Sequence, residues 1–524
     1  MKKEYAAIPR EKFRFVQQES KILDEKPATK PRGYFWDALQ RFCKDKASVT
    51  AAVIIFLIIV YAFVTPLAIT THDSSFMVSH YARKPARIPA LRKWGIFDGG
   101  VNRDLTESAL IRLLALGMGA ADVDGTGATV EEGMESAYMP LIYIGQGEQT
   151  IGPGGKPVFA YPSRVDTYLE VGFVYRSIEQ DELKKMLAWQ KETGKQLLYP
   201  LIDTDSPYCA DPADANLWYK TNKRQQAVRP NANGTDSLIA YGPGMTLEDN
   251  YKRTADGDIM YYAYTGGGSL ETAQYKVRVL YYNYYQYLYG FEPSYLMGTE
   301  SQGYDMALRI AGGIRLSLLI ALIVCAMNFL LGAIYGAIEG YYGGITDLVM
   351  ERLCDILSGV PFIIVATLFQ IHLAQRAGPF ISLLFAYVLT GWISTAYRVR
   401  TQFYRFKHQE YVLAARTLGA KDRRIIFKHI FPNTLGTIIT ASALAIPSTI
   451  LSESMLSYLG IVNLGSVDGT SLGALLADAE SRWIQFPHLM LYPALFISLL
   501  MICFNLFGNG LRDAFNPALR GVES

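Results

Sequence analysis

Six apolar stretches alternate with polar sequence along the chain and predict helices that cross a membrane. A transmembrane helix needs about 20 apolar residues to cross about 30 Å of hydrocarbon. Five stretches have this length without a charged residue, namely 47–71, 316–338, 377–397, 430–452 and 489–511. A sixth, near 356–373, is shorter, but 348–353 lengthens it if Glu351 and Arg352 lie at its polar end. The chain is therefore expected to be mainly α-helical, with six membrane spans.

The positions of lysine and arginine residues orient these spans, because cytoplasmic loops carry an excess of them. Such residues lie before the first span and gather between the fourth and fifth, at Arg41, Lys44, Lys46, Arg398, Arg400, Arg405, Lys407, Arg416, Lys421, Arg423, Arg424 and Lys428. Six spans counted from an inside start place both termini in the cytoplasm, as tails of 1–46 and 518–524. The segment 398–433 is then also inside, and 72–297 is outside. The first apolar stretch is expected to be a retained anchor, since a long polar segment precedes it and no cleavage pattern follows.

The polar region 72–297 is long enough to fold around a core of its own. Apolar residues at helical spacing between 183 and 189 predict a helix, which 177–180 would cap and Gly194 would end. We expect this region to be an extracytoplasmic α+β domain, placed between the first and second spans.

Other parts of this region have less specific patterns. A strand is expected at 196–202, whereas the tyrosine-rich stretches 261–264 and 276–289 fit either a strand or a helix. Tyrosine clusters are more often core than a platform for peptide binding, and we favour core here. Glycine, asparagine and aspartate predict loops at 122–127, 152–155 and 231–236.

Composition excludes several classes of protein. Half of the 524 residues are apolar and the mean hydropathy is +0.12, so the chain combines membrane-embedded and water-exposed parts. The formal net charge of +2 gives no general attraction for nucleic acid. Only Cys209 lies in the polar region 72–297, which therefore cannot hold an internal disulfide.

The sequence lacks the common motifs for nucleotide binding and catalysis. The segment 152–156 has neither the spacing nor the hydroxyl of a phosphate-binding loop, and His-Glu-x-x-His and Gly-x-Ser-x-Gly do not occur. His72 and His80, with Asp73 nearby, lack a third ligand and the spacing of a metal site. We therefore expect no catalytic residue, metal or cofactor in this chain.

The segment 410–433 predicts a helix, a turn and a second helix. Val412, Ala415 and Leu418 recur at helical spacing, Gly419 allows a break, and a second apolar face continues until Pro432. Small side chains would let a soluble partner approach the first helix closely. The alternative is an ordinary solvated loop with the positive charge of any cytoplasmic segment.

The spacing of Ala414, Ala415, Gly419 and Pro432 resembles the "EAA" signature of the permeases of ABC importers. Leu413 stands where that family usually has glutamate, Phe431 replaces a leucine, and Glu410 lies three residues earlier. In that family the short helix docks into a cleft of an ATPase subunit. The resemblance implies coupling through Glu410, Ala414, Ala415, Arg416, Leu418, Gly419, Ala420, Asp422 and Pro432.

A second set of residues, which we name the pre-span motif, lies directly before the second span. It consists of Gly298, Thr299, Glu300, Gly303, Asp305 and Arg309. It resembles the corresponding motif of the C-type dipeptide and oligopeptide permeases, with Glu300 in place of aspartate. Further similar pieces lie at 340–344, 451–460 and 505–517. The resemblance covers 296–517 and implies a five-helix permease core at 298–517, but it implies nothing about 72–297.

This family resemblance implies a permease subunit of an oligopeptide importer in the bacterial inner membrane. Its expected partners are a second homologous permease, two cytoplasmic ATPases that hold ATP and magnesium, an extracytoplasmic peptide-binding protein and the lipid bilayer. The cargo could instead be dipeptides or nickel chelates. The rival class is a membrane-anchored extracytoplasmic receptor or enzyme, which would not need an ATPase.

One ionisable residue, Glu453, follows a long uncharged run in the fifth span. A charge at membrane depth is costly unless it faces water or a partner group. With Ser452 and Ser457 beside it, Glu453 either lines the translocation pathway or lies near the outer interface.

Overall fold

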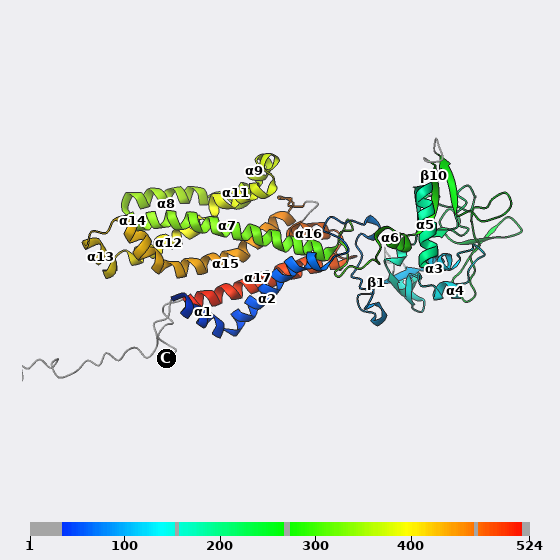
Figure 1. Ribbon diagram of the computed structural model, residues 1–524, viewed down its shortest axis with the longest axis horizontal. Coiled ribbons are helices and arrows are strands. Elements are labelled where there is room, and N and C mark those ends of the chain that lie inside the picture. The colour runs from blue at the N-terminus through cyan, green and yellow to red at the C-terminus, as the bar shows by residue number, and fades with distance from the viewer. Residues whose placement is uncertain (1–33, 152–156, 267–272, 466–469, 516–524) are drawn as a thin grey trace, which may run out of the picture.

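The structure, a computed structural model, describes residues 34–151, 157–266, 273–465 and 470–515. A helical bundle forms one part of the elongated molecule and an α+β domain forms the other (Figure 1). Most of the predicted tail 1–46, all of 518–524 and the predicted loop 152–155 lie outside the described residues.

Five helical segments among the described residues are long and apolar enough to cross a membrane. They are Lys46–Ala68, Met306–Tyr342, Pro379–Phe406, Asp422–Tyr458 and Pro487–Phe515. In the order of the chain they correspond to α2 (Lys46–Ala68), α7 (Met306–Tyr342), α11 (Pro379–Gly391) with α12 (Ile393–Phe406), α15 (Phe431–Tyr458) with the turns before it, and α17 (Pro487–Phe515). They confirm the five uninterrupted spans predicted from the sequence.

The sixth predicted span is a bent pair of helices. Helix α8 (Gly344–Ser358) and α9 (Phe362–His372) meet at an angle of 72°, and the chain has six spans if this pair counts as one. The break contains Gly359 and Pro361. Proline has no backbone N–H to donate and disfavours helical backbone in the residue before it, which explains why α8 ends here.

Apolar side chains join α2, α7 and α17 into the centre of the bundle. Ile58, Ile314 and Leu500 are among the buried residues of this cluster. The shorter helices α1 (Tyr34–Lys44) and α16 (Leu472–Ala479) flank it, whereas α10 (Ala374–Ala377) packs against α9 and α11. The outward-facing side chains of α2 are apolar, with Phe56, Phe63 and Leu67 more than half exposed, as expected of a helix that faces lipid.

The α+β domain lies in the chain between α2 and α7. One antiparallel sheet has the order β1-β4-β2, with β3 also pairing with β4, and a second has the order β5-β10-β6, with β9 also pairing with β10. A hairpin of β7 and β8 completes it. The strands are β1 (Gly100–Thr106), β2 (Leu141–Ile144), β3 (Glu148–Ile151), β4 (Pro157–Asp166), β5 (Phe173–Glu179), β6 (Leu198–Tyr199), β7 (Val228–Pro230), β8 (Asp236–Leu238), β9 (Tyr262–Gly266) and β10 (Gln274–Leu280).

Helix α3 (Glu107–Ala121) forms the core of this domain, since its residues from Leu113 to Ala120 are all buried. Trp218 packs against it and donates a 2.7 Å hydrogen bond to the backbone oxygen of Ala115. The other helices are α4 (Val130–Glu135), α5 (Gln180–Thr193) and α6 (Tyr281–Tyr289).

The structure has both helices and strands between α2 and α7, and several of them differ in detail from the elements expected from the sequence. Helix α5 exists and ends at Gly194, whose φ of 69° is left-handed. Glu179 occupies its N-cap position without a side-chain capping hydrogen bond, and 177–179 belong to β5. The expected strand at 196–202 is reduced to β6. The undecided stretch 276–289 is strand first and helix second, because its first half pairs with β5 while its second half packs tyrosines. The loop at 122–127 is present as expected, and the loop expected at 231–236 ends at residue 235, because Asp236 begins β8.

Many tyrosine side chains of the α+β domain lie in its core. Those with at most 1% exposure include Tyr81, Tyr168, Tyr199, Tyr219, Tyr285 and Tyr295. They stack on one another and on buried cations; the Arg87 guanidinium lies 5.0 Å from the ring centres of both Tyr168 and Tyr282. The exposed tyrosines in the described part of this domain are Tyr143, Tyr262, Tyr264 and Tyr289.

Candidate functional site

The segment 410–433 forms the end of the bundle farthest from the α+β domain (Figure 1). Helix α13 (Glu410–Thr417) is followed by a turn at Gly419, whose φ is 80°. The chain then forms α14 (Asp422–Arg424) and a π-helical turn, η8 (Ile425–Ile430). The predicted helix and turn are thus observed.

The second apolar face was expected to continue until Pro432, and the helix runs on through this residue into α15, as the span predicted at 430–452 requires. Proline interrupts a helix by removing one hydrogen bond and by crowding the carbonyl group four residues earlier. Here the wider π-helical turn directly precedes Pro432, which places it in the first turn of α15, where a missing N–H is tolerated.

This segment has one packed face and one exposed face. Val412, Ile425 and Ile430 are fully buried against Ala337 of α7 and Phe403 of α12. Leu418 is 88% exposed. Of the coupling residues predicted from the sequence, Ala415 and Ala420 are half-buried, and the exposed ones are Glu410, Ala414, Arg416, Leu418, Gly419, Asp422 and Pro432. Leu413, at the position of the family's glutamate, is also exposed.

Polar contacts connect this segment with the last turn of α7. The Tyr341 hydroxyl donates a 2.6 Å hydrogen bond to Oδ1 of Asp422 and accepts a 3.4 Å bond from Arg416. One residue earlier, the backbone oxygen of Gly340 accepts a 2.9 Å bond from Nζ of Lys407. The exposed turn is therefore fixed to a membrane-spanning helix by direct hydrogen bonds as well as by apolar packing.

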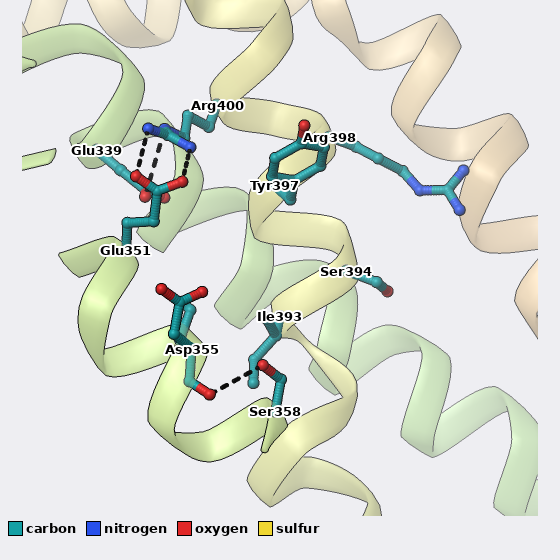
Figure 2. Close-up of a pocket in the computed structure, with 10 residues that line it drawn as sticks. Glu339, Glu351, Asp355, Ser358, Ile393, Ser394, Tyr397, Arg398 and Arg400 are labelled. Carbon is teal, nitrogen blue, oxygen red and sulfur yellow. Dashed lines mark hydrogen bonds and ion pairs between the residues drawn. The ribbon is translucent and has the colours of Figure 1, made fainter. Parts of the chain in front are cut away.

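An arginine with three acidic partners joins three helices near this end of the bundle. Arg400 of α12 forms paired hydrogen bonds of 2.6 and 2.9 Å with Asp347 and of 2.8 and 3.0 Å with Glu351, both on α8. Glu339 of α7, only 3% exposed, lies 3.4 Å from the same guanidinium. Figure 2 shows this guanidinium facing the carboxylates of Glu339 and Glu351.

A cavity of about 350 Å³ lies beside this cluster, between α8 and α12. Asp355 and Ser358 line it from α8, and Ser394, Tyr397 and Arg398 line it from α12 (Figure 2). From the sequence, Arg400 was only one of many basic residues, and its acidic partners were not identified. The spacing of Asp347 and Glu351, four residues apart on one helical face, is the signal that could have indicated a shared cation.

The Glu453 side chain is fully buried between α15 and α7. Its carboxylate accepts hydrogen bonds from Ser317 at 2.8 Å and from Ser457 at 3.1 Å. Ser452 faces another direction and accepts a 2.8 Å bond from Tyr387 of α11. The structure thus brings Glu453 and Ser457 together and places Ser452 apart from them.

The pre-span motif forms a clasp between the two ends of the α+β domain. Thr299 accepts a 2.8 Å bond from the backbone of Lys84 and donates one to the oxygen of Tyr81. Gly298 and Gly303 have φ values of 78° and 101°, and a Cβ on either would lie 2.2 Å from a backbone oxygen of the opposite strand. Glycine is therefore required at both positions.

The acidic and basic residues of the clasp are largely buried. Asp305 caps α7 by accepting a 2.7 Å bond from the N–H of Ala307, and its Oδ2 lies 3.0 Å from Nε2 of His72. The guanidinium of Arg309 lies 3.8 Å from the ring centre of Tyr304. Burial raises the pKa of Glu300 above its ordinary value and lowers the pKa of Lys84.

The described residues contain no group of three or more histidine, cysteine, aspartate or glutamate side chains that could hold a metal ion. His72 and His80, considered at the sequence level, do not share a ligand: the first contacts Asp305 and the second stacks on Tyr281 at 4.3 Å between ring centres.

Comparison with known proteins places the bundle in a transporter family. Residues 328–521 match the family described as binding-protein-dependent transport system inner membrane component. Residues 33–85 match the N-terminal transmembrane domain of oligopeptide transport permease C. The region between these two matches contains most of the α+β domain.

Individual relatives agree with these matches. The oligopeptide transport system permease protein OppC of Bacillus subtilis is 40% identical over 223 residues, which are 43% of this chain and 72% of that protein. OppC of Haemophilus influenzae is 41% identical over 228 residues, covering 43% and 71%. The dipeptide permease DppC of Bacillus subtilis is 38% identical over 229 residues, covering 43% and 68%. A solved inward-facing structure of the MetNI methionine ABC transporter is 15% identical, with a TM-score of 0.34 over 40% of this chain and 98% of the other.

The bundle, its exposed helix–turn segment and these matches define the chain as a multi-pass inner-membrane permease component of an ABC transporter. It belongs to the OppC and DppC family of peptide transport permeases. Proteins of this class are not enzymes, since ATP hydrolysis takes place on partner subunits.

Proposed function

We propose that this chain is one of two membrane subunits of an importer that carries oligopeptides into a bacterial cell. A second, homologous permease completes the channel, two cytoplasmic ATPases bind ATP and magnesium, and an extracytoplasmic binding protein delivers the peptide. The cargo named for the relatives, oligopeptides and dipeptides, supports peptide over nickel chelate.

The exposed helix α13 is the observation that carries this proposal. It has small side chains at the exposed Ala414 and the half-buried Ala415, while its inner residue Val412 is fully buried against the bundle. A short helix of this kind can enter a cleft of a soluble subunit and transmit force, because its base is packed and cannot yield. A receptor or ectoenzyme anchored by the same helices would have no use for such a surface.

The basic residues around α13 support a cytoplasmic location for 398–433. With this orientation both termini are cytoplasmic, and the region 72–297 lies outside. The α+β domain joins the bundle at both of its ends through the pre-span clasp, so it lies beside the outer mouth of the channel. We propose that the domain contributes to the surface on which the peptide-binding protein docks.

Closure of the ATPases would move α13 and, through Tyr341 and Asp422, the membrane helices between inward-open and outward-open arrangements. We propose that Glu453 and Ser457 face the pathway in one of these arrangements, with Ser452 at its edge. In the conformation described here Ser317 of α7 covers the Glu453 carboxylate. Movement of α15 relative to α7 would uncover it.

Reconstitution of the whole complex in proteoliposomes tests this function. ATP-dependent uptake should be measured for a labelled oligopeptide, a dipeptide and a nickel chelate, with an Ala415→Arg complex as the inactive control. Uptake of the oligopeptide above the other cargoes supports the proposal. Failure of the chain to co-purify with any ATPase would support the receptor class instead.

A further inference from the structure

A short loop before β1 exposes a cluster of large apolar side chains. We name residues 88–97 the Trp94 loop. Trp94 is 76% exposed, Ile96 52% and Phe97 45%. No other aromatic side chain in the described part of the α+β domain is as exposed as Trp94, and three large apolar side chains within four positions are unusual for a surface in contact with water alone.

The backbone holds these side chains outward. The loop is closed by a 2.8 Å hydrogen bond from the N–H of Ile88 to the oxygen of Phe97. Within it, Trp94 donates a 2.9 Å bond to Leu91, and Gly95 turns the chain with a φ of 70°. At the base of the loop, Arg164 donates hydrogen bonds of 2.7 and 2.9 Å to the carboxylate of Asp98. The exposed tip is thus built on a hydrogen-bonded frame.

The loop emerges where the α+β domain joins the bundle, next to β1 in Figure 1. Arg87, directly before it, exchanges two 2.9 Å backbone hydrogen bonds with Tyr295. Three residues earlier, the oxygen of Lys84 accepts a 2.9 Å bond from Thr299, seven positions before α7 begins at Met306. The guanidinium of Arg83 lies 5.6 Å from the ring centre of Phe486, directly before α17. The segment directly before the loop is therefore joined to residues close to the start of two membrane-spanning helices, α7 and α17.

We propose that the tip of the Trp94 loop inserts into the lipid–water interface at this end of the bundle. Tryptophan and other aromatic side chains favour that interface, where the ring meets acyl chains and the polar edge stays wet. The lipid-facing surface of α2 continues toward the same end, since Phe63 and Leu67 in its last turns are exposed.

The size of the patch favours lipid over a protein partner. A specific protein interface buries about 800 Å² on each side, far more than three side chains provide. Insertion of a few aromatic and aliphatic side chains, by contrast, is enough to tether a domain that is already attached by its two chain ends. The inserted tip would hold the α+β domain at a fixed tilt above the membrane. This inference needs only a membrane-spanning bundle and does not depend on the cargo.

Fluorescence in lipid nanodiscs tests the insertion. A single cysteine, Ile96→Cys, is placed in a variant without the native cysteines, labelled with the environment-sensitive dye NBD, and assembled into the whole complex. The matched control is Asn233→Cys, at an exposed position in the β7–β8 hairpin. Phospholipids with a spin label on the acyl chain serve as the quencher. Trp94→Cys is a second labelling site in case one variant assembles poorly.

Insertion predicts a blue-shifted emission and loss of fluorescence with the spin-labelled lipid at position 96 or 94, and neither effect at position 233. Equal, unquenched emission at all three positions would overturn the proposal. So would a photo-crosslinker at position 94 that couples to the second permease or the binding protein instead of lipid.

Discussion

The Tyr341 hydroxyl and the Asp422 carboxylate lie 2.6 Å apart and join the last turn of α7 to the helix that follows the exposed turn at Gly419. If the ATPases move α13, this hydrogen bond transmits the movement directly to α7, a membrane-spanning helix. Apolar packing between the same elements supports the segment but has no equivalent directional restraint.

Replacement of Tyr341 by phenylalanine should therefore weaken coupling without preventing assembly. A hydrogen bond to a charged group contributes about 1.5–3 kcal/mol. We expect peptide uptake per ATP hydrolysed to fall severalfold while the amount of complex in the membrane stays constant. Both rates are measured in the same proteoliposomes.

Tyr342→Phe is the matched control for this variant, because Tyr342 is the next residue and is 56% exposed. It should transport like the unmodified protein. Unchanged peptide uptake per ATP hydrolysed in Tyr341→Phe would show that the hydroxyl hydrogen bond does not contribute to coupling.

Gly419 offers a test that separates backbone shape from side-chain bulk. Its φ of 80° suits glycine, tolerates asparagine and is strained for β-branched residues, while no atom lies within 4 Å of an added Cβ. We expect Gly419→Val to abolish uptake at equal expression and Gly419→Asn to keep a large part of it. Equal loss in both variants would indicate that the partner, and not the turn, excludes a side chain here.

Several features of the fold could be predicted from the sequence because they depend on local patterns. Uncharged runs of sufficient length defined five spans, and the Ala414 to Gly419 spacing located the exposed turn. The bend between α8 and α9 could not be predicted in this way, because hydropathy does not indicate the break in the helix at Pro361. The π-helical turn before Pro432 was not predicted, because no residue pattern in 425–430 indicates one.

Contacts between distant residues were not predictable in the same way. Arg400 finds Glu339 and Glu351 only once three helices pack, and Ser317 reaches Glu453 across 136 positions of sequence. The pre-span motif was recognised by resemblance, but its role as a clasp follows from hydrogen bonds to Tyr81 and Lys84, which precede it by more than 200 residues.

The buried ion pair of Arg87 and Asp166 should be important for the stability of the α+β domain. The two groups are 3.0 Å apart, and their side chains are 1% and 0% exposed. Asp166→Ala would leave the guanidinium buried without its charge partner, which typically costs about 3–5 kcal/mol. We expect faster hydrogen exchange of the α3 and β4 amides in the whole protein, measured by mass spectrometry.

The control for this variant is Asp181→Ala, which removes an exposed ion pair with Lys184. Such pairs contribute about 0–1 kcal/mol, so exchange should hardly change. Similar exchange rates in the two variants would contradict an important role for the Arg87 pair.

The orientation of the chain can be tested with single cysteines in intact cells. Asn233→Cys and Lys421→Cys are both at exposed positions. A membrane-impermeant thiol reagent added outside should label position 233 and leave position 421 unlabelled until the cells are permeabilised. The cation excess between the fourth and fifth spans is the reason for this expectation. Labelling of position 421 in sealed cells would invert the orientation.

The proposed docking role of the α+β domain is best tested by removing the domain between Arg87 and Tyr295. Arg87 and Tyr295 exchange two backbone hydrogen bonds, so a short flexible linker can replace 88–294 and leave the clasp of Lys84 and Thr299 in place. If the domain forms part of the docking surface, the truncated complex should bind the peptide-binding protein more weakly and take up less peptide, while it still assembles with the ATPases and hydrolyses ATP. Affinity is measured by titration of the binding protein onto complexes in nanodiscs. A second variant with Trp94→Ser and Phe97→Ser keeps the domain and removes only the apolar tip of the Trp94 loop. Unchanged affinity and uptake after truncation would mean that the binding protein docks on the bundle alone and that the domain serves another purpose.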